Sequence, residues 1–145
     1  ARYNEDTPFD LALRKAGARF VFEAEAIVEW RPQGSVRRLF MQFYRYARGD
    51  AQSRLWFRHY AKAYAMAGLS LGLCAAGGLW PPALGGLAGL AVVYWGRHAA
   101  RARRRTSSVP AAVVAPLANV IVDVAHVVGY TRGIVERVPH ETGEH

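Results

Sequence analysis

Two adjacent carboxylates near the start of the chain are the residues best suited to acid–base chemistry. Glu5 and Asp6 directly precede Thr7 and Pro8, which are typical of a helix start, since threonine can cap a helix and proline fits its first position. The positive end of the helix dipole would keep at least one carboxylate ionised. A rigidly held carboxylate can act as a general base toward a hydroxyl group, whereas the simpler interpretation is dipole complementation alone.

Other chemistry-bearing residues give weaker signals. His59, His98 and His126 have no mutual spacing typical of a metal site, so a structural or interfacial role is favoured for each. A single cysteine, Cys74, excludes a disulfide framework within the chain. The glycines between Gly68 and Gly89 follow no phosphate-loop pattern.

The segment that follows the two carboxylates is predicted to form a helix and then two short strands. The sequence predicts a helix over residues 8–16 that ends at Gly17, and strands over residues 18–22 and 26–30. These elements bury too little to be stable alone. We therefore expect them to close the edge of an α/β domain whose larger part precedes this chain.

Residues 35–59 have the pattern of amphipathic helices. Val36, Leu39, Phe40 and Phe43 recur at helical spacing, and arginines occupy the remaining face. Gly49-Asp50 predicts a bend between two short helices. Such helices are typical of a membrane surface, and the alternative is an amphipathic helix packed on a soluble core.

Residues 60–97 predict a transmembrane helical hairpin. Residues 61–80 are apolar over about the 20 residues that cross a bilayer, Pro81-Pro82 interrupts the run, and residues 83–96 are apolar again. Arginines flank both ends of the hairpin, which predicts that both ends are cytoplasmic. The alternative is a helical hairpin buried in a soluble protein.

Residues 98–145 comprise a basic juxtamembrane segment, a third apolar helix and a polar tail. The helix is predicted over residues 109–138, and Asn119, Asp123 and His126 share one of its faces. That polar stripe favours contact with protein, water or headgroups. A third membrane span would send Arg132 outside, against the charge rule, so a re-entrant or interfacial helix is slightly favoured over a transmembrane one.

The net charge of +8 indicates an anionic partner. Arginines flank the apolar runs, as they do beside membranes, and no nucleic-acid-binding motif accompanies them. The arginine cluster over residues 101–105 therefore favours a membrane and not nucleic acid.

Several stretches together resemble a known family. Residues 4–7, 13–17, 21–30 and 42–49 are similar in order and spacing to the end of the catalytic domain of membrane-bound family 2 glycosyltransferases, especially those of bacterial exopolysaccharide (succinoglycan-type) biosynthesis. The likeness covers about the first fifty residues, with a family-like membrane tail behind them.

The resemblance implies roles for five residues. Asp6 would be the catalytic base of an inverting sugar transfer, and Glu5 would support it. Gln42, Arg45 and Tyr46 occupy the family's Gln-x-x-Arg-Trp motif, which binds near the acceptor and the nucleotide diphosphate. Tyr46 replaces the tryptophan, which puts acceptor stacking and processive polymerisation in question. An arginine fork suits a diphosphate, and Gln42 lies one turn away on the same helix.

The resemblance also implies the setting of the reaction. Residues 1–34 would end a GT-A domain. A divalent metal, Mn²⁺ or Mg²⁺, would be held by residues upstream of this chain. The chain by itself would therefore be inactive. The expected partners are a nucleotide-sugar donor, a lipid-linked or polysaccharide acceptor, and the inner membrane, with a multi-pass anchor and a cytoplasmic catalytic part. The alternative from another class is a non-catalytic membrane scaffold that binds anionic lipid and a partner protein.

Overall fold

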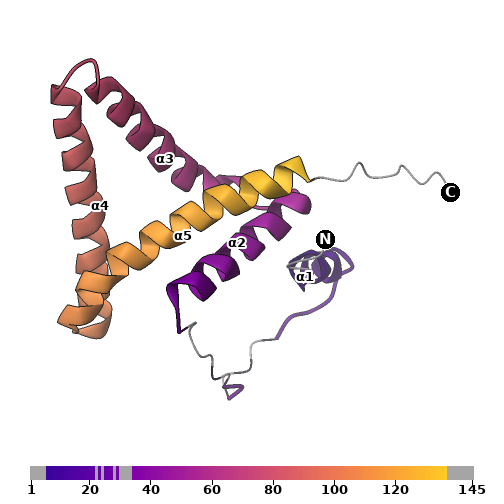
Figure 1. The fold of residues 1–145 in the computed structure, drawn as a ribbon. Coiled ribbons are helices and arrows are strands. Elements are labelled where there is room, and N and C mark those ends of the chain that lie inside the picture. Colours follow the sequence, from indigo (N-terminus) through magenta and orange to yellow (C-terminus); the bar gives the residue numbers. More distant parts are fainter. Residues whose placement is uncertain (1–5, 22, 24, 28, 30–33, 137–145) are drawn as a thin grey trace.

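The computed structural model describes residues 6–21, 23, 25–27, 29 and 34–136. This part of the chain contains helices and no strand (Figure 1), so the prediction that the chain is mostly α is confirmed. The helices are α1 (Asp6–Lys15), α2 (Val36–Gln52), α3 (Phe57–Gly77), α4 (Pro82–Thr106) and α5 (Val109–Val135).

The first helix forms as the sequence predicts, but it stands apart from the packed helices. α1 ends before Gly17, whose φ of +83° is the expected left-handed stop. None of its residues is buried, and the side chain of Phe9 is 61% exposed. The apolar face of α1 is therefore uncovered within the described residues.

The stretch predicted to form strands is irregular where the structure describes it. Residues 18–21, 26, 27 and 29 lie in neither helix nor strand, and Val21 and Ile27 are each 86% exposed. Residues 22, 28 and 30, which belong to the same predicted strands, lie outside the described residues. A strand needs a partner for its backbone groups, and this part of the chain offers none. The α/β edge stays a prediction.

α2 is longer and straighter than the sequence predicts. Ser35 caps it, its hydroxyl accepting a hydrogen bond from the backbone N–H of Arg38 at 3.3 Å. The helix continues through Gly49 and Asp50, so the bend predicted there was wrong. The break comes over residues 53–56, where Arg54 and Trp56 have φ values of 56° and 59°.

Close packing against α5 explains why α2 continues. A Cβ at Gly129 would collide with the backbone of Tyr44, and one at Gly133 would collide with the backbone of Arg48. The two helices therefore approach at small residues, as helices in lipid commonly do. The core at this contact contains Ala47, Ala51, Tyr60 and Tyr130. Tertiary contact overrides the local helix-breaking tendency of glycine.

α3, α4 and α5 form an open triangle (Figure 1). α3 and α4 meet at the turn around Trp80 and Pro81, with Pro82 opening α4 as predicted. α4 then continues past the apolar run to Thr106, and Ser108 caps α5 by accepting a hydrogen bond from the N–H of Ala111 at 3.3 Å. α5 runs from the end of α4 past the start of α3 to lie beside α2 (Figure 1), so it contacts α2, α3 and α4.

One helix of the described part is long and apolar enough to cross a membrane, and it is α5, with a mean hydropathy of 1.9 over its most apolar window. The predicted hairpin is helical, but α3 and α4 fall short of that standard. A lysine, glycines and tyrosines dilute α3, and arginines dilute α4. The structure thus supports membrane association through α5, whereas the multi-pass arrangement and its orientation stay predictions.

Candidate functional site

Asp6, the predicted base, lies at the exposed N-terminus of α1. Its Oδ1 atom accepts a hydrogen bond from the backbone N–H of Thr7 at 2.9 Å. Glu5, its predicted supporting residue, lies outside the described residues.

Gln42, Arg45 and Tyr46 lie together on α2. The side-chain amide nitrogen of Gln42 donates a hydrogen bond to the Tyr46 hydroxyl at 3.2 Å. Arg45 and Tyr46 are exposed, and the Tyr46 ring packs edge-on against Phe43 with centroids 6.2 Å apart. The amide therefore holds the tyrosine in place beside a solvent-exposed guanidinium group.

The carbonyl of Gln42 is a further feature of this group. Its Oε1 atom is buried and has no hydrogen-bond partner among the described residues. A buried acceptor without a donor is costly, and sites for ligands or water commonly explain one. This group on α2 thus combines a buried acceptor without a donor and an exposed cation.

The structure does not bring the two predicted parts of the site together. Asp6 contacts its neighbour Thr7, and within the described residues α1 is not among the helices that pack extensively on one another. The chain between Lys15 and Val36 connects the two helices in sequence.

The polar stripe of α5 faces protein, which is one of the environments predicted for it. Asp123 accepts a hydrogen bond from the Tyr94 hydroxyl at 2.6 Å, and the Asn119 amide donates to the carbonyl of Ala115 at 2.8 Å. The His126 ring packs edge-on against Tyr60 with centroids 5.0 Å apart. These contacts satisfy polar groups that would be costly in lipid.

A buried carboxylate that sequence reasoning missed sits at the corner between α2 and α3. Asp50 is 7% exposed and accepts a hydrogen bond from the Tyr60 hydroxyl at 2.5 Å. The Tyr130 hydroxyl donates to the carbonyl of Leu55 at 3.1 Å, inside the break between these helices. The sequence signal was present, because an acidic residue stands on the otherwise apolar face of α2, but it was interpreted as a bend.

An ion-pair cluster joins the last turns of α2 and α5. Glu136 accepts a hydrogen bond from the Arg48 guanidinium at 2.6 Å and also pairs with Arg132. Desolvation raises the pKa of Glu136, but the hydrogen bonds from Arg132 and Arg48 outweigh it and hold that pKa below its ordinary value. The cluster therefore links the C-terminal ends of α2 and α5.

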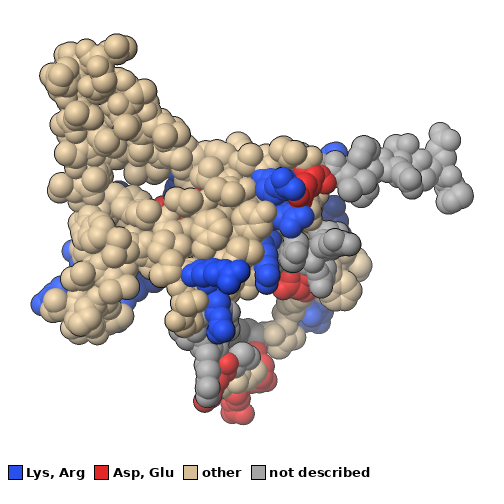
Figure 2. All heavy atoms as spheres, in the orientation of Figure 1, with Lys and Arg blue, Asp and Glu red and all other residues tan. Residues whose placement is uncertain are grey.

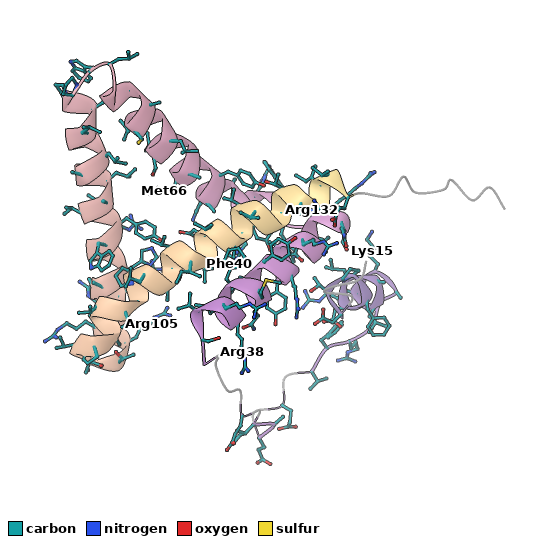
Figure 3. The ribbon with its side chains drawn as sticks, viewed as in Figure 1. Lys15, Arg38, Phe40, Met66, Arg105 and Arg132 are labelled. Carbon is teal, nitrogen blue, oxygen red and sulfur yellow. The ribbon has the colours of Figure 1, made fainter. Side chains whose placement is uncertain are left out.

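Basic side chains gather at two places on the surface. Figure 2 shows them around the ends of α2 and α5 and at the corner where α4 meets α5, whereas the end of the triangle at the α3–α4 turn carries neither sign of charge on this face. Figure 3 places Arg105 at the α4–α5 corner and Arg38 near the start of α2.

The part of the chain that the structure describes contains no candidate metal site. No group of three or more histidine, cysteine, aspartate or glutamate side chains there could hold a metal ion. His59 and His126 do approach, with ring centroids 5.9 Å apart, but as an edge-on aromatic contact.

Comparisons with known proteins give no assignment. No family model and no curated protein matches the sequence, and no solved structure matches the fold.

Proposed function

We propose that this chain is the C-terminal part of a membrane-anchored, inverting glycosyltransferase. It would transfer a sugar from a nucleotide-diphosphate donor to a lipid-linked or glycan acceptor at the cytoplasmic face of the inner membrane. The observation that carries the proposal is the position of Gln42, Arg45 and Tyr46 on a helix that packs along α5, the helix long enough to cross a membrane.

That position suits a reaction at a membrane surface. A lipid-linked acceptor presents its hydroxyl groups just above the headgroups, at the depth of an interfacial helix. α2 would lie there together with α5, which runs beside it (Figure 1), with its apolar side chains against α5 and with Arg37, Arg38 and Arg45 exposed. Guanidinium groups at this depth attract anionic lipid, and that of Arg45, one turn from Gln42, suits the diphosphate.

In the proposed reaction Asp6 takes the proton of the acceptor hydroxyl. The acceptor oxygen then attacks the anomeric carbon of the donor sugar, and the nucleoside diphosphate leaves from the opposite face with the bonding electron pair. Arg45 stabilises the charge that develops on the leaving diphosphate. The side-chain amide of Gln42 holds the Tyr46 hydroxyl on the same face of α2.

A divalent metal held by the preceding part of the enzyme would neutralise the diphosphate. The proposal also requires that α1 be held near α2 when that preceding domain is present, so that Asp6 and Arg45 reach the two ends of one transferring group. The uncovered apolar face of α1, including Phe9, is the surface that such a domain would pack against.

The test measures nucleoside diphosphate release by membranes that contain the full-length enzyme, with a panel of nucleotide sugars and Mn²⁺ or Mg²⁺. Asp6→Asn should lower turnover by about 10²–10⁴-fold, and Arg45→Ala by about 10²-fold. Asp10→Asn on the same helix and Arg37→Ala on α2 are matched controls, because both residues are exposed and outside the proposed site. Normal turnover in correctly folded Asp6→Asn would refute the assigned base.

A non-catalytic membrane scaffold is the second candidate. The observation that favours it is the exposed group of arginines at the α4–α5 corner, which comprises Arg101, Arg103, Arg104 and Arg105. Such a group binds anionic headgroups without any catalytic machinery. Folded, membrane-inserted protein that releases no nucleoside diphosphate from any donor would favour this function.

A further inference from the structure

Side chains of α3, α4 and α5 line a half-open cavity of about 580 Å³. This volume lies within the range of about 300–1,000 Å³ typical of small-molecule sites. Its walls are small and apolar side chains from all three helices, among them Met66, Leu87, Leu90 and Val124. Figure 3 shows Met66 on the side of α3 that faces the other two helices.

Ser70 and one hydrogen-bonded pair interrupt the apolar wall. Tyr94 and Asp123 both line the cavity, and the Tyr94 hydroxyl donates its proton to Oδ2 of Asp123 at 2.6 Å. Because that proton is used within the pair, the remaining lone pairs of both side chains can only accept hydrogen bonds. The pair therefore selects a ligand that donates, and the carboxylate repels anions.

We propose that this cavity binds a long-chain alcohol. The hydrocarbon chain would lie against the apolar walls, and the terminal hydroxyl would donate a hydrogen bond to the Asp123 carboxylate. A neutral hydroxyl suits the site better than an ammonium group, because a second charge in an apolar cavity carries a large desolvation cost. The proposal does not depend on glycosyl transfer.

The position of the cavity suits such a ligand. Its third wall is α5, the helix long enough to cross a membrane, so hydrocarbon chains of the bilayer lie next to the opening when α5 is inserted. An aspartate in the middle of an apolar helix is costly unless it is hydrogen-bonded. Tyr94 donates to one oxygen of the Asp123 carboxylate, and the carboxylate can accept further hydrogen bonds.

The experiment uses the whole chain in lipid nanodiscs and a long-chain alcohol that carries a photoactivatable diazirine in its chain. Illumination followed by mass spectrometry should place the label on peptides of α3, α4 and α5 that line the cavity. Unlabelled alcohol should compete about tenfold better than the fatty acid of equal chain length, since only the alcohol gains a hydrogen bond to the carboxylate. Label elsewhere, or equal competition by the acid, overturns the proposal.

Variants separate the role of the cavity from that of its polar pair. Ala67→Trp should fill the cavity and abolish labelling, whereas Ala75→Trp, on an exposed position of the same helix outside the cavity, should not. Asp123→Asn should keep labelling but remove the preference for the alcohol, because an amide can also donate to a carboxylate. If Ala67→Trp does not fold, the Asp123→Asn result still decides, and an unchanged preference in it overturns the assigned contact.

Discussion

α5 packs against its neighbours in two different ways along its length. Its C-terminal half meets α2 at Gly129 and Gly133, where the backbones touch and no side chain could be added. Its middle part faces α3 and α4 across a cavity of about 580 Å³. The same helix therefore forms a closed contact at one end and an open one at its centre.

The difference follows from where small residues fall. At the α2 contact, glycines on α5 face backbone atoms of α2, so the small residues produce close approach. In the hairpin, Gly68, Gly72, Gly85 and Gly89 have nothing within 4 Å of a Cβ position. A small residue permits contact but does not cause it, and neighbouring large side chains decide the outcome. The α2–α5 unit, here called the platform, is closely packed, whereas the hairpin has its close glycine contact at Gly77, where a Cβ would collide with Leu84.

The largest expected effect comes from emptying the centre of the platform. Tyr130 is the largest fully buried side chain of the described part and donates a hydrogen bond to Leu55. Tyr130→Ala should lower the free energy of unfolding by about 3–5 kcal/mol, because it leaves a cavity. Val92→Ala, at a position 71% exposed on α4, should change it by less than about 0.5 kcal/mol. Denaturation in detergent micelles measures both, and equal losses would contradict the comparison.

The glycines offer a matched test of close approach. Gly129→Ala should destabilise the protein by about 3 kcal/mol, because the backbone of Tyr44 cannot move away without separating the helices. Gly72→Ala, with open space around it, should stabilise α3 by up to about 1 kcal/mol through helix propensity. Opposite signs in the same denaturation assay are the expected outcome, and a loss of stability in both variants would show that the hairpin is packed more closely.

The hydrogen bond at the α2–α3 corner joins the two regions. Tyr60→Phe removes the hydroxyl that donates to the buried Asp50 carboxylate and should cost about 2 kcal/mol, as expected for a hydrogen bond to a charged group. Asp50→Asn keeps the shape of the acceptor and serves as the companion variant. Hydrogen exchange should show faster opening of residues 53–60 in Tyr60→Phe, and unchanged exchange there would mean that the corner is held by other contacts.

The smallest expected effect is that of the ion-pair cluster at the end of the platform. The pKa of Glu136 is lowered by Arg132 and Arg48, so the pair stabilises the folded state above the ordinary pKa of 4.5 and loses that effect as the pH falls through the lowered value. Glu136→Gln should melt at a lower temperature than the wild type at neutral pH. The two melting temperatures should converge in acid, and a constant difference across this pH range would exclude the ion pair as its cause.

Hydrophobic periodicity and helix-capping residues predicted several helix boundaries from the sequence alone. The helix start at Thr7-Pro8, its stop at Gly17 and the proline start of α4 were all predicted within a few residues, because each depends on local backbone chemistry. The bend predicted at Gly49-Asp50 was wrong, since the helix continues to Gln52 and α5 packs against Arg48 and Ala51 on either side of those residues. The strands at residues 18–22 and 26–30 required partners that pattern alone cannot supply.

The candidate site divides in the same way. Gln42, Arg45 and Tyr46 share a helix, and their neighbourhood follows from helical spacing alone. The pairing of Tyr94 with Asp123 and of Tyr60 with Asp50 could not be read from the sequence, because each joins two helices whose relative position depends on packing.

The sequence by itself determined that this chain is mostly helical, basic and divided between charged and apolar stretches, because composition and periodicity are properties of consecutive residues. Only the tertiary structure decided that α2 lies against α5, that three helices line a half-open cavity, and that the polar stripe of α5 is satisfied by tyrosine and backbone partners. These features depend on which small residues meet which backbone across the fold, and that information is absent from any single segment.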